Sequence, residues 1–573
     1  MSKIQPSRAF SSRKLSGFRG FGHTEVLSGV SPSSVRNFRP CKDGTLRIRS
    51  GYSAVLPFSY PLRGYWEGKV DNVAKKYAVA GNKVYSLSET LKAKTAVGTL
   101  KTASGQVSFA QFLGVLYLLD GTDIYYLESK TGTFSVHAPY VPLYGDKWHP
   151  TNYGDVCERR NQLTNRLRVR YLDSTGTTTF VLPYYPSAVD YVLINGEKTK
   201  NFTWSGRDVV VPGAALMTTV EIGFVVDMEL EGLEPIISSP HAFVFGSGTE
   251  EQMVVYGNDN YFLHCATPVT LGKLVESRRV YPDAGTLYFS AFGEIPVGDT
   301  AHPVTAVCSC KGGFLAFTSD RTSFFTYDNE HPFPSLTTVI SGTGCTSPGA
   351  ACLCGDTPMA LDDGGVTLFH SDRTHPEIIN PVKISEAVSD LFDLSFCRRA
   401  ISFWDGRHEE LWIGDPKNPD GLFWIWNRAL ETWYTFDGIG ANALFPVSLE
   451  EGKRIGMLQG TNLCLFDDTL HKDGGKEITA VYRTSFFDCS HAETPRRSVR
   501  SSLCATPDGN RITLTLETER SQKSFVFPEN RSEVPSHYDC RFAPGRHRFL
   551  RCTITSTGGG DARFYSLAVY EKL

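Results

Sequence analysis

The chain has 573 residues and a formal net charge of −3, so its bulk lacks the positive excess typical of nucleic-acid-binding proteins. Its 52 Gly, 31 Pro and 12% aromatic residues indicate an all-β protein rich in turns, and the length suggests three or four domains of about 150 residues. No apolar run is long enough to span a bilayer and the N-terminus lacks the apolar core of a secretory signal, so we expect no membrane anchor and reduced thiols.

The N-terminal segment, residues 1–60, is predicted to be an extended basic arm. Residues 1–50 contain ten Lys or Arg and two acidic residues, and short strands are expected at 45–50. Such an arm can bind a polyanion or an acidic partner surface, and charge alone equally allows a solvated terminus. The candidate docking residues are Arg8, Arg13, Lys14, Arg19, Arg36 and Arg39.

Paired short strands recur through residues 61–138 and again through 236–477. Residues 77–87 (YAVAGNKVYSL) and 115–127 (VLYLLDGTDIYYL) each place a turn between two apolar strands. From residue 254 the pairs recur at about 40–60 residues, which is within the range of β-propeller blades. We therefore predict a β-propeller, while stacked β-sandwiches would give a similar pattern.

The clearest blade is predicted at residues 399–437, where aromatic and branched residues alternate with Asp-Gly, Asp-Pro and Pro-Asp-Gly turns. Such a unit buries its aromatic side chains only against similar units, which favours a repeat architecture. Residues 424 and 426 are two apart and share one face of a strand. The candidate propeller core comprises Trp404, Trp412, Trp424, Trp426 and Trp433.

Two β-sandwiches are predicted beside the propeller. The spacing of the paired strands breaks at residues 139–235, where about six alternating strands indicate an inserted sandwich. Residues 478–573 alternate in the same way and indicate a C-terminal sandwich. One helix is predicted at residues 381–394, because Ile384, Val388 and Leu391 recur at helical spacing.

Reactive or metal-binding chemistry is weakly indicated. Cys308-x-Cys310 and Cys352-x-Cys354, with Cys345 nearby, could bind zinc, but structural zinc sites more often use longer spacers and core thiols are the favoured interpretation. The Asp residues end strands or occupy turns, where capping is their common role. His408 is assigned to a surface strand, and no hydrolase or nucleotide-binding motif occurs. We therefore expect no enzyme activity, catalytic residue, metal or cofactor.

Several segments carry a resemblance to one protein family. These are residues 17–20 (GFRG), 30–37 (VSPSSVRN), 43–52 (DGTLRIRSGY), the blade ending at 424–436 (WIWNRALETWYTF), and 193–196 (LING) in the inserted sandwich. In order and residue pattern, these segments resemble those of the tail stopper or nozzle proteins of short-tailed bacteriophages, also called tail stabilisation or tail tubular proteins. No segment matching a long nozzle tip is identified.

The resemblance implies a structural role in the virion tail. Proteins of this group form a ring, typically a homohexamer, beneath the portal and adaptor proteins, and their propellers surround the channel through which DNA is retained and then ejected. The basic arm would then contact the ring above or a neighbouring subunit, and DNA would pass without sequence-specific binding. The alternatives are a propeller that binds a receptor or glycan and, third, a propeller glycosidase, which needs two carboxylates facing a pocket.

Overall fold

The computed structural model describes residues 10–15, 17–21, 32–247, 251–266, 286–327, 333–488, 498–529 and 534–572. Strands dominate these residues, which confirms the all-β prediction. Helical structure in the described ranges is limited to α1 (Leu233–Ile237), α2 (Leu394–Cys397) and the 3-10 turns η2 (Pro348–Ala350) and η3 (Ser389–Leu391). Within the same ranges, no helix is long and apolar enough to cross a membrane.

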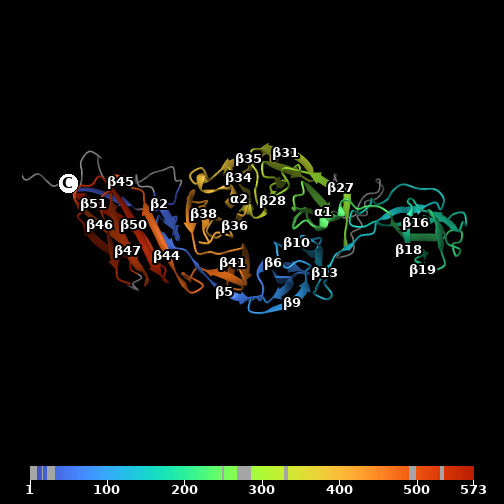
Figure 1. Cartoon of the computed structure of the whole chain (residues 1–573), viewed down its shortest axis with the longest axis horizontal. Coiled ribbons are helices and arrows are strands. Elements are labelled where there is room, and N and C mark those ends of the chain that lie inside the picture. Colours follow the sequence, from blue (N-terminus) through green and yellow to red (C-terminus); the bar gives the residue numbers. More distant parts are fainter. Residues whose placement is uncertain are drawn as a thin grey trace, which may run out of the picture.

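A β-propeller forms the centre of the molecule (Figure 1). Among the described residues there are five separate four-stranded antiparallel sheets and two further four-stranded units, which belong to the 15-stranded sheet that runs on into the C-terminal sandwich. Their innermost strands are β6, β10, β23, β28, β32, β36 and β40, and each of these contacts the next around the circle, with β40 returning to β6. The described part of the chain therefore forms a closed seven-bladed ring.

Each blade consists of four strands, ordered from the centre of the propeller outward. The first four blades are β6 (Leu62–Val70), β7 (Val73–Ala80), β8 (Lys83–Leu87) and β9 (Lys94–Thr99); β10 (Ser108–Phe112), β11 (Val115–Leu119), β12 (Ile124–Leu127) and β13 (Phe134–Val136); β23 (His241–Phe245), β24 (Gln252–Tyr256), β25 (Phe262–Ala266) and β27 (Phe289–Pro296); and β28 (Ala306–Cys310), β29 (Gly313–Phe317), β30 (Arg321–Thr326) and β31 (Ser335–Ser341). The last three are β32 (Ala351–Cys354), β33 (Thr357–Asp362), β34 (Gly365–Ser371) and β35 (Ile379–Lys383); β36 (Ile401–Asp405), β37 (Glu410–Gly414), β38 (Phe423–Asn427) and β39 (Thr432–Phe436); and β40 (Ala443–Leu449), β41 (Gly452–Gln459), β42 (Asn462–Asp467) and β5 (Gly51–Pro57).

Each blade is buried on both faces, because a neighbouring blade or domain covers each side. In β37 of the sixth blade, Trp412 enters the hydrophobic cluster shared with the C-terminal sandwich, whereas Leu411 and Ile413 enter the cluster shared with the fourth and fifth blades. This burial accounts for the nearly continuous apolar runs in the blade sequences, since a strand with one wet face would alternate.

Residues 32–57 close the ring, which corrects the prediction of an extended arm at residues 1–60 for this part of it. Strand β5 is the outermost strand of the seventh blade and pairs antiparallel with β42. Strand β2 (Pro32–Arg36) lies between the outer strand of the sixth blade and β44 (Lys476–Thr484) of the C-terminal sandwich. Strands β3 (Phe38–Pro40) and β4 (Leu46–Ile48) form a hairpin that also joins the sandwich. Backbone hydrogen bonds to distant strands therefore determine the conformation of this segment, and its positive charge does not.

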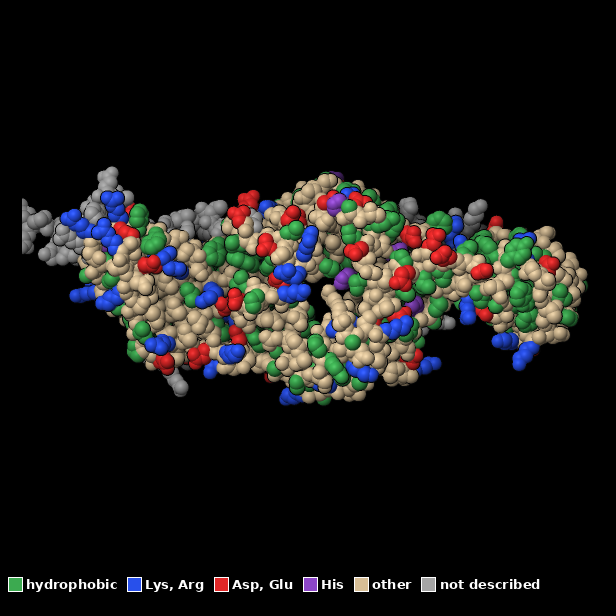
Figure 2. Space-filling view, viewed as in Figure 1, with side chains coloured by type: hydrophobic (Ala, Val, Ile, Leu, Met, Phe, Trp, Pro, Cys, Tyr) green, Lys and Arg blue, Asp and Glu red, His purple; other side chains and the backbone are tan. Residues whose placement is uncertain are grey.

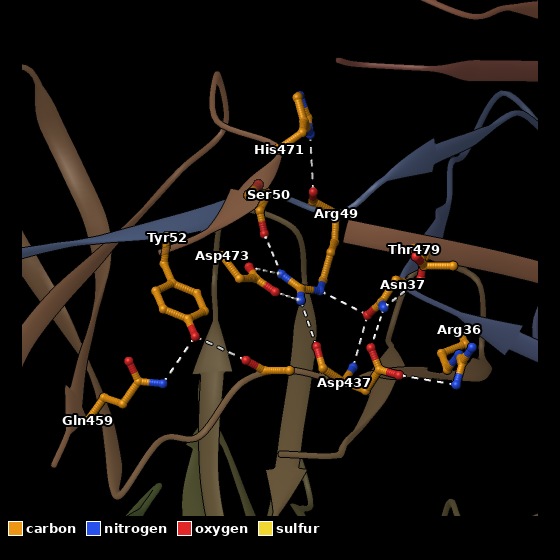
Figure 3. A network of polar contacts seen from close by, with 11 residues as sticks. Arg36, Asn37, Arg49, Ser50, Tyr52, Asp437, Gln459, His471, Asp473 and Thr479 are labelled. Carbon is orange, nitrogen blue, oxygen red and sulfur yellow. Dashed lines mark hydrogen bonds and ion pairs between the residues drawn. The ribbon is translucent and has the colours of Figure 1, made fainter. Parts of the chain in front are cut away.

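Arg49 organises a polar network at this closure (Figure 3). Its side chain is 1% exposed and makes a two-pronged ion pair with Asp473, with Nη1 2.8 Å from Oδ1. It also donates to Asn37 Oδ1 at 2.9 Å and to the carbonyl oxygen of Asp437 at 2.6 Å. Burial raises the pKa of the Asp473 carboxyl although Arg49 acts in the opposite direction. The pair therefore depends on complete hydrogen bonding to offset its desolvation.

The C-terminal sandwich packs directly against the sixth and seventh blades. One of its sheets contains β3, β4, β51 (Arg563–Lys572), β46 (Ser498–Thr506) and β49 (Ser536–Phe542), with β1 (Phe10–Leu15) paired to β51. The other contains β44, β50 (Phe549–Gly558), β47 (Arg511–Thr518) and β48 (Gln522–Phe527), with β43 (Lys472–Asp473) and β45 (Phe487–Asp488) at its margins. Because β2 joins β39 to β44, this second sheet continues the sheet of the sixth blade.

The inserted sandwich connects the second blade to the third. One sheet has the order β15 (Leu143–Trp148), β16 (Arg166–Leu172), β22 (Thr219–Val226), β18 (Pro186–Ile194) and β19 (Glu197–Thr199), and the other has the order β17 (Thr179–Val181), β21 (Asp208–Val210) and β20 (Thr203–Ser205). Its neck is attached to the propeller where β14 (Ala138–Pro139) pairs with β26 (Thr286–Leu287). The two sandwiches extend from opposite ends of the propeller, so the molecule is elongated (Figure 1).

The helix predicted at residues 381–394 is wrong. Strand β35 covers residues 379–383 and pairs with β34, and only the short turn η3 follows before α2. Val388 is buried, but Leu391 is 55% exposed, so the three apolar residues do not share one buried face. Pairing with the blade decided the conformation of residues 379–383, because β34 offers them backbone partners, while residues 384–393 form turns beyond this pairing.

We predict that Arg49→Met lowers the free energy of unfolding by about 3–5 kcal/mol, because it leaves a buried carboxylate without its partner. Arg36→Met is the matched control, since Arg36 pairs with Asp437 at 3.3 Å but its side chain is 45% exposed. The control should cost less than about 1 kcal/mol. Urea denaturation measures both, and equal costs would show that the burial of Arg49 is not what matters.

Candidate functional site

Within the described residues, one group of carboxylate and imidazole side chains is close enough to hold a metal ion. It consists of Asp405, His408 and Glu410, whose candidate ligand atoms all lie within 4.8 Å of one another. Asp405 ends β36, Glu410 begins β37, and the tight turn between them carries His408. Asp405 and His408 line a cavity of about 570 Å³ between the sixth and seventh blades.

Glu410 is fully engaged by its own neighbours. Arg39 donates from Nε to Oε1 at 2.6 Å and from Nη2 to Oε2 at 3.0 Å, while Tyr434 donates to Oε1 at 2.6 Å and Trp412 donates to Oε2 at 3.1 Å. Burial alone would lower the pKa of Arg39, but the charge and hydrogen bonds of Glu410 raise it overall. Four donors occupy this carboxylate, so it is not available as a metal ligand or a proton acceptor.

Asp405 and Asp468 both line the cavity and are also paired, with His408 and Arg407 respectively. Burial raises the pKa of the Asp405 carboxyl, but the hydrogen bond and charge of His408 lower it overall. Burial acts on Asp468 in the same way, and the Ser50 hydroxyl together with nearby cations lowers its pKa overall. His408 is therefore a half-buried partner of Asp405 in a turn, which corrects its assignment to a surface strand.

The six basic residues predicted to dock a partner have different environments. Arg8 lies outside the described residues. Strand β1 contains Arg13 and Lys14, and the Lys14 side chain is exposed. Arg19 is half-buried, and Arg36 is paired with Asp437. The docking role predicted for Arg39 is corrected, because its side chain is only 13% exposed and pairs with Glu410 inside the protein.

The five tryptophans pack in or against the propeller core. Trp412, Trp426 and Trp433 are 2%, 6% and 1% exposed, whereas Trp404 and Trp424 are half-buried at the margin of the cluster between the fourth, fifth and sixth blades. Trp424 and Trp426 both contact this cluster and Ile425 contacts the opposite one, as expected for alternate residues of a strand. Trp404 also lines the cavity beside His408.

The cysteines of the two Cys-x-Cys motifs lie on the neighbouring inner strands β28 and β32. Cys308, Cys345 and Cys354 are buried in the same hydrophobic cluster, and Cys310 and Cys352 are half-buried against it. Burial raises the pKa of Cys345 and of Cys310 to about 12, which disfavours the thiolate form that binds metals. Cys352 differs, because a hydrogen bond from Cys354 lowers its pKa.

Two buried histidines in the third blade gave no signal in the sequence. His264 on β25 is 3% exposed, its Nε2 lies 2.6 Å from Asn260 Nδ2, and its Nδ1 has no hydrogen-bond partner within the described structure. His241 on β23 packs against the Tyr256 ring. Burial lowers the pKa of each imidazole to about 4. Neither residue belongs to a recognisable motif, so only tertiary burial identifies them.

Comparisons with known proteins show weak similarities. No family model matches the chain, and no curated protein matches it. Among solved structures, PorZ, a type-IX secretion system component of Porphyromonas gingivalis, is 10% identical at a TM-score of 0.30; the match covers 86% of this chain and 46% of PorZ. An exo-beta-1,3-galactanase from Phanerochaete chrysosporium is 7% identical at a TM-score of 0.24, with 90% and 99% covered.

A third solved structure is BBS1N in complex with ARL6DN. It is 9% identical at a TM-score of 0.27, and the match covers 73% of this chain and 97% of that one. At these identities and TM-scores, none of the three similarities supports an inference about activity, ligand or partner.

We predict that Trp426→Ala lowers the free energy of unfolding by about 3–5 kcal/mol, because it leaves a large cavity between blades. Trp424→Ala is the matched control on the same strand and face. It should cost less, since Trp424 is only half-buried. Chemical denaturation of both variants measures the difference, and a larger cost for Trp424→Ala would contradict this packing.

We also predict that the protein loses stability as the pH falls. The pKa values of His241 and His264 are lowered from 6.5 to about 4, so the unfolded chain binds protons that the folded chain does not. The stability is therefore complete above pH 6.5 and declines as the pH falls toward 4, by about 2 kcal/mol for each histidine between pH 7 and 5. His241→Gln and His264→Gln should each flatten the dependence of the urea midpoint on pH, and an unchanged slope would contradict the assignment.

Proposed function

We propose that this chain is a ring-forming structural protein of a short-tailed bacteriophage virion. In this role it is the nozzle or stopper below the portal and adaptor proteins, which retains the packaged DNA and forms the channel for its ejection. It acts as a homo-oligomeric ring, with six copies as the expected number, and as a scaffold rather than as an enzyme.

The observation that carries this proposal is that the described N-terminal residues resembling nozzle proteins lie at the closure of the propeller. Asn37 and Arg49 belong to the buried network, and Gly51 packs so closely that a Cβ atom there would lie 2.2 Å from the carbonyl oxygen of Lys472. A Cβ atom on Gly20 would lie 2.0 Å from the carbonyl oxygen of Trp433. The resemblance thus falls on residues with strict architectural roles, which supports a shared architecture.

The shape and charge of the chain support assembly into a ring. A closed ring needs two different surfaces on each subunit that fit one another. Residues 51–477 contain 49 Asp or Glu and 34 Lys or Arg, whereas residues 478–573 contain 14 Lys or Arg and ten Asp or Glu. An acidic body and a basic end favour head-to-tail contacts through electrostatic complementarity.

The same charge distribution supports a role in conducting DNA. Each phosphate that a protein neutralises adds salt-dependent affinity, which would slow the passage of DNA through a channel. An acidic body avoids this retention. The pairing of Glu410 with Arg39 supports a scaffold rather than a hydrolase, because the group that most resembles a catalytic site is used internally.

We predict that the purified protein forms a ring, either alone or when mixed with a portal–adaptor complex from a short-tailed phage. Native mass spectrometry gives the copy number and negative-stain electron microscopy shows the ring. The triple variant Arg8→Glu, Arg13→Glu and Lys14→Glu should bind the portal–adaptor complex at least tenfold more weakly. These positions are preferred to deletion of residues 1–39, which would remove β2 and the partner of Glu410.

The control is Lys198→Glu with Lys200→Glu, two exposed lysines in the inserted sandwich at the opposite end of the molecule. This control should bind the complex as the original protein does. A protein that stays monomeric under all these conditions contradicts the proposed function. A ring that docks equally well in both variants would instead contradict only the role of the basic segment.

A further inference from the structure

The three loops at the far end of the inserted sandwich form the tip of the molecule at that end (Figure 1). Strands β16 and β22 run between the neck and this end, because the segments before β16 and after β22 lead back to the propeller and the two strands pair antiparallel. Strand β18 also pairs with β22 so that Ile194 lies opposite Val220. Loops 173–178, 195–196 and 212–218 are therefore the distal loops, and we call them the tip.

The three tip loops contain no exposed charged residue; Glu197 and Lys198, which follow the 195–196 turn, are exposed. The one ionisable residue of the tip loops is Asp173, which is fully buried and accepts hydrogen bonds from the backbone of Thr175 and Gly176. Loop 212–218 reads PGAALMT. Leu216 is 62% exposed and Met217 is 68% exposed, and Pro212 and Ala215 are exposed beside them. Other tip residues are mostly Ser, Thr, Asn and Gly, and hydrophobic side chains are visible over this end of the molecule (Figure 2).

The backbone of the tip holds these apolar side chains outward. The Met217 amide donates to the carbonyl oxygen of Asp173 at 2.7 Å, and the Asp173 amide donates to that of Thr218 at 3.0 Å. Met217 adopts a φ of +64°, a left-handed conformation that is uncommon for a residue with a side chain. A strained loop that is held by backbone hydrogen bonds and exposes Leu and Met is the arrangement expected of a binding element rather than of an unpacked core.

We propose that the tip inserts into the surface of a lipid bilayer. A stable protein interface needs about 20–30 residues on each side, whereas the exposed apolar part of this tip is a few side chains. The tip is the protruding end of the molecule rather than a groove, so it suits a deformable apolar phase better than a rigid partner. Its hydroxyl and amide groups suit the headgroup layer, where Leu216 and Met217 would reach the upper acyl chains.

The lack of charge and the small apolar area of the tip determine how lipid binding should depend on salt and on the number of copies. Because the exposed tip carries no charge, binding should depend little on anionic lipid or on salt. Two apolar side chains give only weak and reversible partitioning for one copy. Several tips held on one ring would act together, and their effective concentration at the membrane would strengthen attachment by orders of magnitude.

Co-flotation of the full chain with vesicles tests this proposal. Vesicles of phosphatidylcholine, and of phosphatidylcholine with one-fifth phosphatidylglycerol, are each used at low and high salt. The original protein should float with both kinds of vesicle. The double variant Leu216→Asp with Met217→Asp should lose at least tenfold of the bound fraction, because charged side chains do not enter the acyl region.

The matched control is Leu336→Asp with Val339→Asp, two side chains on β31 that are 51% and 48% exposed on the propeller rim. This control should float as the original protein does. Equal binding by the tip variant, or no flotation of the original protein with either kind of vesicle, overturns the proposal. Flotation that appears only with anionic lipid and vanishes at high salt also overturns it, because it indicates the basic surfaces.

Further measurements distinguish a loss of lipid binding from misfolding and from a change in oligomeric state. Circular dichroism and the urea midpoint establish that the tip variant is folded, with Leu216→Ser and Met217→Ser as a milder replacement if it is not. Sedimentation velocity without vesicles should give the same oligomeric state for the variant and the original protein. If the tip variant loses self-association and the original protein never floats, then the tip contacts a second copy and the lipid proposal is wrong.

Discussion

Closure of the ring is the constraint on which the structure depends. A blade cannot bury its aromatic faces alone, so the seven blades are stable only when the last packs against the first. The chain meets this requirement with β5, which comes from the N-terminal segment and completes the blade made by β40 to β42. Arg49 fixes that junction by binding Asp473, Asn37 and the end of the sixth blade in one buried network.

The closure also explains why the polar residues that look reactive are structural. Arg39 belongs to the same N-terminal segment, and it reaches the sixth blade to satisfy Glu410. Carboxylates around the adjacent cavity are also paired, Asp405 with the His408 imidazole and Asp468 with Arg407 and the Ser50 hydroxyl. In a buried seam, an unpaired charge is costly, so full pairing keeps the N-terminal segment in a single register.

The C-terminal sandwich, which is joined to the propeller by a continuous sheet, and the inserted sandwich give the molecule two distinct ends. One end combines the basic sandwich with the exposed part of the N-terminal strand, and the other carries the uncharged tip of the inserted sandwich. A ring of such subunits would present different chemistry on its opposite sides. This polarity is the property that a tail component needs if it binds a protein ring on one side and a cell surface on the other, and both of these roles are proposals.

The sequence by itself determined the all-β class and the blade at residues 399–437, because turn residues, strand propensity and aromatic content act between near neighbours. It also indicated that the tryptophans of this blade belong to a core. Only the tertiary structure decided the conformation of residues 32–57, where Asn37 is hydrogen-bonded to Asp437, 400 positions away in the chain. The charge of that segment suggested a free arm, and the first residues of the helix expected at 381–394 likewise belong to β35. In both segments the outcome depended on backbone partners supplied by distant strands, and local patterns contain no information about which strands will be in reach.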